Sequence, residues 1–351
     1  MADESQNTIN HRVVVRHRGG PEMLLVIEED LPEPVPDEVR IRVEAAGVSG
    51  YDLTVRAHRF PGAAKPPFTL GEDVVGTVDK VGDGVSGVEP GQRVAAWTFG
   101  DGGGYAEYVC RPAGLVVPVP AGLDSGDAAC LVVNYFTASL YLHQTAGVRH
   151  GERILVQGAA GGVGTALLQL GKLAGLETYG TASAYNHELV SSLGATPIDY
   201  RNEDFVARIQ ELTGDGVDVV FDLIAGARQL RRSYRCLRKG GRLVMMGSVE
   251  ASRRGLPSIV PSLLLVAGLK LLPDGKRVPM GPNMTDYPFK HHDWYRQTLA
   301  ELLDLGAAGK LKPVIAERIP LTEARRAHEL LERGGYSGKV VLTTRPIGRT
   351  S

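Results

Sequence analysis

The sequence predicts an α/β protein in which a doubly wound parallel sheet is joined to a separate β-rich domain. Apolar strands alternate with helical segments from Gly151 to Ser248, and such alternation is typical of a parallel sheet covered by helices. Upstream, glycine and proline turns recur about every 8–12 residues between short apolar stretches, which is typical of an all-β domain. A chain of 351 residues is long enough for two or three domains.

The β-rich domain is expected to follow a polar leading segment, residues 1–10. A first strand is predicted at Arg12–Arg16. A second is predicted at Glu38–Ala46, because apolar and charged residues alternate there with the period of a half-buried strand. Further strands are expected at residues 74–81, 93–96 and 105–109.

Helical patterns begin where the β-rich stretch ends. Asp124 or Ser125 can cap a helix that covers Ala128–Leu142. Near the C-terminus, helices are predicted at 294–305 and 322–333, the second with Thr322 as its cap.

The parallel sheet is predicted to contain five strands, at residues 153–157, 176–181, 196–198, 217–223 and 241–246. A last strand, Gly338–Thr344, is expected to return to the β-rich domain, since the parallel sheet does not need it. The predicted domain boundaries are therefore 1–130, 131–274 and 275–351, with the third segment completing the first domain.

The strongest motif lies where the strand 153–157 turns into a helical pattern. The turn reads Gly158, Ala159, Ala160, Gly161, Gly162, Val163, Gly164. A strand, a glycine turn and a helix in this order are typical of a dinucleotide site, in which the pyrophosphate rests on the N–H groups of the helix N-terminus. We expect Gly161 to allow the close approach and Gly164 to let the helix lie tightly on the strand, with Ala159 in place of the usual first glycine.

The residues after the second parallel strand favour NADPH over NADH. An NAD site usually has an acidic residue there for the ribose hydroxyl, but residues 181–187 contain no carboxylate. Ser183, Asn186, Tyr200 and Arg201 can instead donate hydrogen bonds to a 2′-phosphate.

Charge and composition argue against several other classes of protein. A formal net charge of −1 predicts no attraction to nucleic acid or to a membrane surface. Three widely spaced cysteines indicate a reducing compartment, and we expect the cytoplasm. The apolar run Ile259–Leu272 is too short and interrupted to span a bilayer, so a helix at a domain or subunit boundary is expected there. One exposed helix face is expected to hold most of the basic residues Arg231, Arg232, Arg235, Arg238 and Lys239.

Several stretches together resemble the medium-chain dehydrogenase/reductase superfamily in its zinc-free quinone oxidoreductase branch. The resemblance implies a Rossmann domain, a GroES-like catalytic domain, and a substrate pocket lined by loops such as 55–68 and 270–292. It also implies a homodimer formed through the nucleotide domain, and the apolar stretch Ser258–Leu272 fits a buried interface. The matching stretches are 45–53, 70–76, 104–109, 158–164, 240–244 and 338–342.

The resemblance also implies that zinc is absent. Ser49 stands where the zinc enzymes of this superfamily have a cysteine ligand, and Glu72 stands where they have a histidine ligand. Serine is a poor zinc ligand, and one carboxylate cannot replace three soft or borderline ligands. Glu72 and Asp73 are expected to bond to local backbone instead.

Catalytic candidates follow from the same match. Tyr51 replaces a hydroxyl residue that touches the substrate oxygen, so it is either a general acid or an apolar wall of the pocket. Ser49 lies where many zinc-free relatives have asparagine. Thr137 either lies beside the nicotinamide or bonds to its own helix backbone. Further cofactor contacts are implied for Asn134, Ala225, Gly226, Gly247, Ser248, Val249 and Lys339, the last of which is otherwise exposed to solvent.

The expected activity is therefore an NADPH-dependent, zinc-independent reduction of a quinone or of an activated C=C bond in an enone or enal. Hydride addition to a conjugated carbon spreads negative charge over an enolate, so it needs no metal ion. One alternative is an enoyl-thioester or polyketide-type enoyl reductase. The other is a protein that binds NADPH without catalysis.

Overall fold

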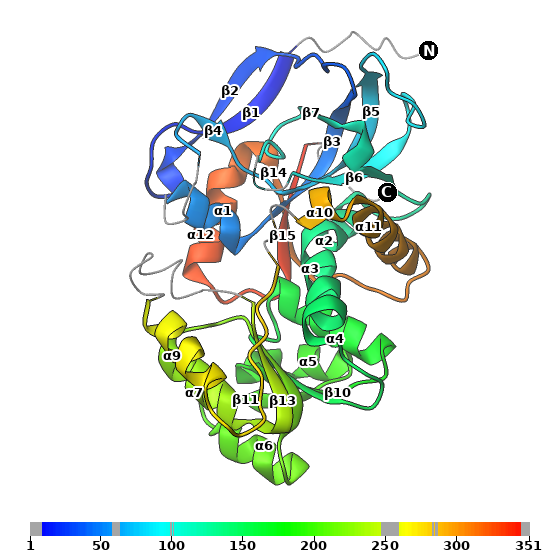
Figure 1. Ribbon diagram of the computed structural model, residues 1–351. Helices are drawn as coiled ribbons and strands as arrows, with labels where there is room; N and C mark the ends of the chain where they lie inside the picture. The colour runs from blue at the N-terminus through cyan, green and yellow to red at the C-terminus, as the bar shows by residue number, and fades with distance from the viewer. Residues whose placement is uncertain are drawn as a thin grey trace. The chain divides into compact units, whose positions relative to one another are not determined.

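The computed structural model describes residues 9–57, 64–98, 100, 102–246, 260–282, 284 and 287–344. The chain divides into two compact units, one made of Met1–Val133 with Met284–Ser351 and the other of Asn134–Asn283. Figure 1 shows their helices and strands.

The first unit is built mainly on antiparallel strands, and only β14 and β15 among its described strand pairs are parallel. One sheet has the order β2-β1-β4, and the other has the order β14-β15-β3-β5-β6-β8 with β7 also paired to β3. The strands are β1 (Ile9–Val15), β2 (Leu24–Asp30), β3 (Glu38–Val48), β4 (Phe68–Thr69), β5 (Asp73–Val81), β6 (Arg93–Trp97), β7 (Tyr108–Pro112), β8 (Val116–Pro118), β14 (Ile315–Pro320) and β15 (Lys339–Thr343).

The pairing of β15 confirms that the end of the chain returns to this unit. Val340 to Thr343 pair antiparallel with residues 45–48 of β3. The alternation in β3 is confirmed for the apolar face, because Val39, Ile41 and Val43 are buried in the core, but Arg40 on the other face is also buried. The strand expected at 105–109 instead begins at Tyr108, because the Tyr105 carbonyl accepts the Val13 N–H and Ala106 bridges to β1.

Short helices complete the first unit. They are α1 (Gly50–Arg56), α2 (Ser125–Cys130), α10 (Tyr287–Lys290), α11 (His292–Ala307) and α12 (Ala324–Arg333). Asp124 caps α2 by accepting the Asp127 N–H, as expected. The Thr322 cap is wrong, because a 3₁₀ turn at Leu321–Glu323 precedes α12. The helix expected at Ala128–Leu142 is not uniform: α2 is followed by a π turn (Leu131–Tyr135), α3 (Phe136–Leu140) and a second π turn (Tyr141–Ala146).

The second unit is the expected doubly wound Rossmann-like domain. Its parallel strands are β9 (Arg153–Gln157), β10 (Glu177–Ala182), β11 (Thr196–Asp199), β12 (Val217–Asp222) and β13 (Leu237–Met245), in the order β11-β10-β9-β12-β13. The order reverses between β9 and β12, so their carboxyl ends form the topological switch point where such sheets bind ligands. The helices between them are α4 (Gly162–Leu173), α5 (His187–Ser192), α6 (Phe205–Thr213) and α7 (Ala227–Arg235), and α9 (Val260–Lys270) follows β13.

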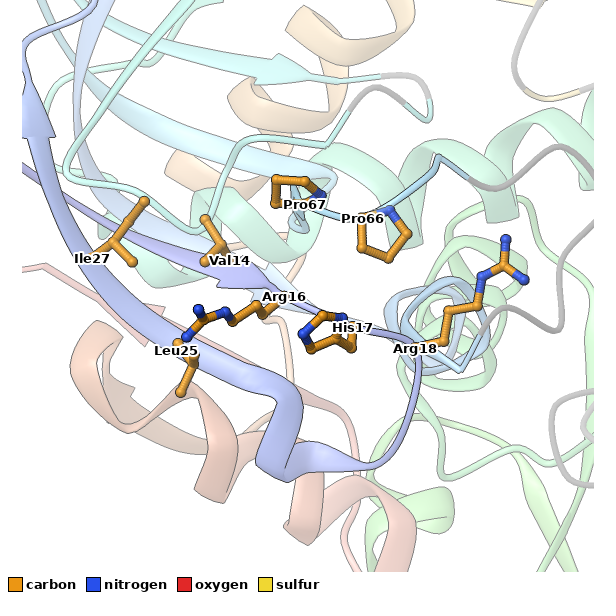
Figure 2. Close-up of a pocket in the computed structure, with 8 residues that line it drawn as sticks. All are labelled: Val14, Arg16, His17, Arg18, Leu25, Ile27, Pro66 and Pro67. Atoms are coloured by element: carbon orange, nitrogen blue, oxygen red, sulfur yellow. The ribbon is translucent and has the colours of Figure 1, made fainter.

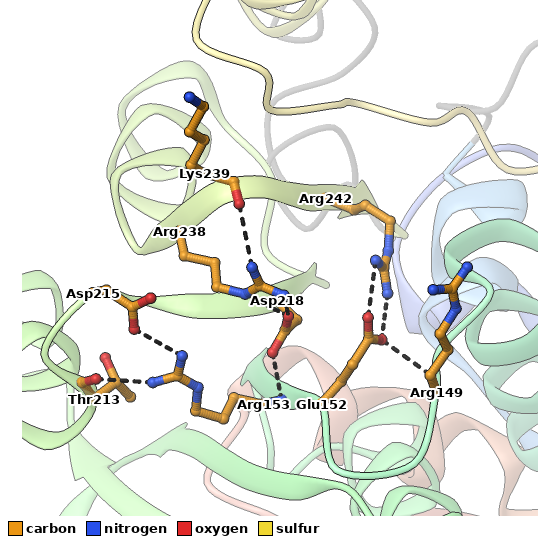
Figure 3. A network of polar contacts seen from close by, with 9 residues as sticks. All are labelled: Arg149, Glu152, Arg153, Thr213, Asp215, Asp218, Arg238, Lys239 and Arg242. Carbon is orange, nitrogen blue, oxygen red and sulfur yellow. Dashed lines mark hydrogen bonds and ion pairs between the residues drawn. The ribbon is translucent and has the colours of Figure 1, made fainter.

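The basic cluster of this unit is divided between two elements. As expected, most of these residues lie on one helix: α7 contains Arg231, Arg232 and Arg235, whereas Arg238 and Lys239 lie on β13. Arg238 donates to Asp218, which also accepts the backbone N–H of Arg153 (Figure 3). These charges therefore hold the amino ends of the strands together. Within the described residues, no helix is long and apolar enough to cross a membrane.

A buried ion pair joins the two chain segments that make up the first unit. The Lys339 ammonium on β15 contacts the Asp73 carboxylate on β5, and both side chains are almost fully buried. Asp73 also accepts the backbone N–H of Val133 at 2.8 Å. Gly47 of β3 makes room for this contact, because a Cβ there would lie 2.0 Å from Lys339 Cε and 2.4 Å from Asp73 Oδ2. The solvent exposure expected as the alternative for Lys339 is therefore wrong, and so is the expectation that Asp73 bonds only to local backbone.

Lys339→Met is expected to destabilise the protein by about 3–5 kcal/mol, because it leaves the buried Asp73 carboxylate without its cation. The double variant Asp73→Asn/Lys339→Met should recover most of the loss, since neither remaining side chain is charged. Denaturant unfolding measures both, with the exposed Lys310→Met as the matched control. A double variant that is no more stable than the single one would show that repulsion and desolvation at Asp73 are not the cause.

Candidate cofactor and catalytic sites

The glycine turn lies at the switch point of the parallel sheet. It connects β9 to α4, and Gln157 at the end of β9 lies opposite Asp222 at the end of β12. Gly161 is the N-cap of α4 and has extended backbone, so the helix starts at Gly162. The first N–H groups of a helix have no partners within it, and here Gly162, Val163 and Gly164 provide them. This arrangement suits the pyrophosphate of a dinucleotide.

The glycines of this turn serve different purposes. A Cβ on Gly164 would lie 2.3 Å from the Gly158 carbonyl oxygen, so only glycine lets the helix pack on the turn. A Cβ on Gly161 would meet no described atom closer than 3.4 Å, so the fold itself leaves that position open. Ala159 is tolerated because Gly180 on β10 faces it: a Cβ on Gly180 would lie 2.7 Å from the Ala159 methyl. The missing first glycine is thus compensated on the neighbouring strand.

The proposed phosphate donors differ in exposure. Ser183 and Asn186 are buried directly after β10, whereas Tyr200 and Arg201 are exposed after β11. The Arg201 guanidinium lies 5.8 Å from the centre of the Tyr200 ring. Since β10 and β11 are parallel neighbours, with Ala182 opposite Asp199, all four residues lie at the same edge of the sheet.

Asp199 is a carboxylate at this edge that the sequence pattern did not single out. It accepts the Arg201 N–H at 3.0 Å and the Asn202 side-chain amide at 2.7 Å. These hydrogen bonds lower the pKa of Asp199. They also tie the carboxylate to its own turn, where it positions Arg201.

The turn after β12 has a strained backbone. Ala225 and Gly226 have positive φ angles of 58° and 89°. Residues other than glycine rarely adopt this backbone region. The buried Asp222 carboxylate holds the turn by accepting the N–H groups of Ile224 and Ala225 at 3.0 and 2.9 Å. The other predicted contacts of this edge, Gly247, Ser248 and Val249, lie outside the described residues.

Asn134 lies in the first π turn, and Thr137 lies in α3 between the two π turns. Asn134 is buried in the first π turn, and Thr137 is half-buried in α3. The alternative role for Thr137 is not observed, because its hydroxyl makes no hydrogen bond within the described part of the chain. Single π turns within helices are frequent at functional sites, and this hydroxyl is available for a ligand.

Ser49 caps the helix that presents Tyr51. The Ser49 hydroxyl donates to Asp52 Oδ2 at 2.7 Å, and the Ser49 N–H donates to the same oxygen at 2.8 Å. Asp52 also accepts the Gly71 N–H at 3.1 Å, so it ties α1 to the segment that contains Glu72. The Ser49 hydroxyl is thus engaged in a capping box, and this contact assigns it a positioning role. Tyr51 is half-buried against the core of the unit.

Glu72 is a buried acid that the sequence presented only as a missing zinc ligand. Its Oε2 accepts the Trp97 indole N–H at 3.0 Å and the Gly100 N–H at 2.8 Å, so its partners are not the adjacent backbone. Burial, and then the negative charge of Asp52, raise the pKa of Glu72 to about 7. Such an acid exchanges its proton near neutral pH. No pattern in the sequence indicates this, because the value depends on burial.

A hollow of about 690 Å³ on the first unit is lined in part by the loop that was expected to border a substrate pocket. Pro66 and Pro67 lie on one side of it, and Arg16 and His17 lie on the other (Figure 2). Tyr51 and Ser49 are not among its lining residues. We therefore assign no part of the reaction to this hollow.

The donor set does not fit zinc. Ser49 is occupied as a helix cap, and one carboxylate oxygen of Glu72 already accepts two N–H groups. Across the residues that the structure describes, no group of three or more His, Cys, Asp or Glu side chains has metal-binding geometry. Zinc requires three or four closely placed ligands, so no step of the reaction is assigned to a metal.

Glu72→Gln should change how stability depends on pH. Because the pKa of Glu72 is raised from 4.5 to about 7, the folded state binds its proton more tightly than the unfolded state. The resulting stability is present below pH 4.5 and is lost as the pH rises to about 7, by up to about 3 kcal/mol.

The glutamine variant should lack this loss, so it should gain on the wild type as the pH rises. Urea unfolding at pH about 5 and about 8 measures the difference, with exposed Glu89→Gln as the control. Parallel pH profiles for wild type and Glu72→Gln would contradict the raised pKa.

Two family models match this chain. The alcohol dehydrogenase GroES-like domain matches residues 35–121, and the zinc-binding dehydrogenase model matches residues 193–342. The positions discussed as zinc ligands, Ser49 and Glu72, lie within the first match and outside the second.

Known proteins resemble the chain over nearly its whole length. The quinone oxidoreductase of Rattus norvegicus is 33% identical over 92% of this chain and 94% of that protein. A phenolphthiocerol/phthiocerol polyketide synthase of Mycobacterium tuberculosis is 34% identical over 95% of this chain but only 15% of that protein. A mycobacterial protein solved in complex with NADPH has a TM-score of 0.82, with 29% identity over 95% of this chain and 99% of that chain.

The structural and sequence matches agree. A GroES-like unit and a Rossmann-like unit are combined in one chain, the glycine turn lies at the switch point, and quinone oxidoreductases match from end to end. The chain therefore belongs to the medium-chain dehydrogenase/reductase superfamily, in its quinone oxidoreductase-like branch, and is an oxidoreductase with a nicotinamide cofactor.

Proposed function

We propose that the protein is an NADPH-dependent, zinc-independent reductase that transfers hydride to a quinone or to the activated C=C bond of an enone or enal. The observation that carries the proposal is the edge of the parallel sheet where β10 and β11 end. No carboxylate follows β10, and Arg201 and Tyr200 follow β11 with an exposed cation and phenol. A 2′-phosphate suits these donors better than a bare ribose does.

Bound NADPH would supply the hydride, and the chain would orient the substrate and supply the proton. A conjugated acceptor becomes an enolate or quinol anion when hydride arrives, so it needs hydrogen-bond donors more than a Lewis acid. We propose Tyr51 as the donor to the substrate oxygen and Thr137, whose hydroxyl makes no hydrogen bond to the described residues, as the group beside the nicotinamide. Ser49 acts on Tyr51 by fixing the first turn of α1.

The structure does not favour the cofactor contact that the sequence position of Lys339 implied. Its ammonium is already held by Asp73 in the first unit, so any contribution to cofactor binding would come from a neutralised cation. We propose Lys339 as a structural residue. The phosphate contacts are proposed for Ser183, Asn186, Tyr200 and Arg201 alone.

An enoyl-thioester reductase is the second candidate, because the polyketide synthase segment matches 95% of this chain at 34% identity. A protein that binds NADPH without catalysis is the third. NADPH oxidation with a panel of quinones, enones and enoyl thioesters distinguishes them. Preferred turnover of the thioesters favours the second candidate, and binding without turnover favours the third.

A homodimer is proposed through α9 of the second unit. Leu263 and Leu264 are 48% and 69% exposed, and Leu271 just beyond the helix is 84% exposed. Adjacent exposed leucines are costly in water, since buried apolar surface contributes roughly 25 cal/mol per Å². Unpaired cysteines at positions 110, 130 and 236 fit the proposed cytoplasmic location.

The first prediction from the proposed function concerns the cofactor. Arg201→Ala should weaken NADPH binding by about tenfold or more, because a charge-assisted hydrogen bond contributes about 1.5–3 kcal/mol. NADH binding should barely change. Fluorescence titration of both cofactors measures this, with exposed Arg228→Ala as the control. Equal losses for NADPH and NADH would remove Arg201 from the phosphate site and leave Tyr200 and Asn186.

The second prediction concerns the proton. Tyr51→Phe keeps the ring and removes the hydroxyl, so enone turnover should fall by about 10²-fold or more. NADPH affinity should stay near wild type, and quinones should be less sensitive because a quinol anion is a weaker base. Steady-state kinetics in the presence of a chelator measure the turnover of enones and of quinones, with Tyr108→Phe as the control. Unchanged enone turnover would mean that water supplies the proton and Tyr51 only shapes the pocket.

The third prediction concerns assembly. Light scattering at micromolar concentration should show a dimer for the wild type and a monomer for Leu264→Asp, because the variant places a charge on the apolar face. Leu173→Asp changes a leucine of α4 that is 48% exposed and serves as the control. A monomeric wild type would remove α9 as the interface between protomers.

A further inference from the structure

A cavity of about 320 Å³ in the second unit collects positive charge. Its lining includes Arg242 on β13, Lys270 at the end of α9, and Lys276 and Arg277 in the segment that follows. The cavity is remote from the glycine turn along the strands. Arg242 lies opposite Val219 of β12, and Val219 lies opposite Ile154 near the amino end of β9. The glycine turn instead follows the carboxyl end of β9.

Two of these arginines are held side by side by the backbone. Arg277 forms a parallel bridge with Arg242. The Arg277 N–H donates to the Gly241 carbonyl and the Leu243 N–H donates to the Arg277 carbonyl, both at 2.9 Å. Directly opposite residues of neighbouring strands present their side chains on the same face, and like charges in such a pair are destabilising. An unfavourable pair of like charges of this kind is the sort of local conflict that proteins tolerate at functional sites.

The acids nearby compensate only part of this charge: Glu152 pairs with Arg242, and Asp274 lies beside Lys276. Arg242 forms an ion pair with Glu152 through two contacts of 3.2 and 2.5 Å (Figure 3). Lys276 donates to the Tyr234 carbonyl at 3.2 Å. In the described part of the chain, neither Lys270 nor Arg277 contacts a carboxylate. The cavity therefore has more cations than acids.

Two buried polar atoms of the lining residues also lack partners. The Nε of Arg242, a residue that is only 8% exposed, and the Oγ1 of Thr145 make no hydrogen bond to the described residues. A buried polar atom without a partner costs about 1–3 kcal/mol. Such atoms in a native protein commonly mark the place of an ion or water.

We propose that this cavity binds the phosphate group of a small anion, at a site separate from the cofactor. A dianionic phosphate would neutralise Lys270 and Arg277, separate the charges of Arg277 and Arg242, and accept hydrogen bonds from several donors at once. A carboxylate has one charge and two oxygens, so it matches four cationic side chains less well. The shared chemistry fits both free inorganic phosphate and a phosphate ester.

The test is calorimetric titration of the full-length protein with inorganic phosphate and with phenyl phosphate at constant ionic strength, with acetate as the monoanionic comparison. Saturable phosphate binding is expected for the wild type, with affinity about tenfold lower in Lys270→Gln and in Arg277→Gln. Arg231→Gln, which removes an exposed charge of α7, should bind as the wild type does. Binding of phenyl phosphate as well would identify an ester as the ligand, and binding of inorganic phosphate alone would identify the free ion.

A thermal-unfolding readout distinguishes a ligand site from a structural role. Without phosphate, Arg277→Gln should be at least as stable as the wild type, because it removes one member of a like-charge pair. With phosphate, the wild type should gain in melting temperature and Arg277→Gln should gain less. No saturable binding, or equal affinity in the wild type and both cavity variants, would overturn the proposal.

Discussion

The close contact between the glycine turn and α4 is the constraint on which the nucleotide domain depends. Gly164 lies against the carbonyl of Gly158, and any side chain there would separate the helix from the turn. That contact directs the helix N-terminus toward the switch point, where β9 and β12 end beside each other. The open position at Gly161 then leaves the helix N–H groups accessible. Packing of the chain against itself therefore shapes the proposed anion site.

Burial decides the charge states of the catalytic unit. Asp52, Glu72 and Asp73 are three buried carboxylates, and burial raises the pKa of each. Asp73 is compensated by Lys339, and Asp52 by the N–H groups of Ser49 and Gly71. Glu72 has two N–H donors but no cation, and its pKa is raised to about 7. Asp52 lies on the helix that carries Tyr51 and also belongs to this cluster. The position of Tyr51 therefore depends on the contacts that Asp52 makes.

The candidate site was predictable where the sequence order alone brings residues together. The turn 158–164, the missing carboxylate after β10 and the donors after β11 all follow from strand order, because parallel neighbours end at the same edge. Ser49 and Lys339 were harder to interpret, since a cap and an ion pair depend on contacts that sequence position does not reveal. Lys339 finds Asp73 far away along the chain only because β15 pairs with β3 and Gly47 leaves space between them.

The sequence by itself determined the two-unit architecture, the parallel sheet and the return of the last strand, because hydrophobic period and turn residues are local properties. It did not reveal β2, whose apolar run does not alternate, or the π turns beside Thr137, which depend on packing along one helix. Only the tertiary structure decided which carboxylates are buried, which partner each one has, and that Arg242 and Arg277 lie side by side. Solvent exposure and electrostatic neighbours are properties of the folded chain, since they arise between residues far apart in sequence.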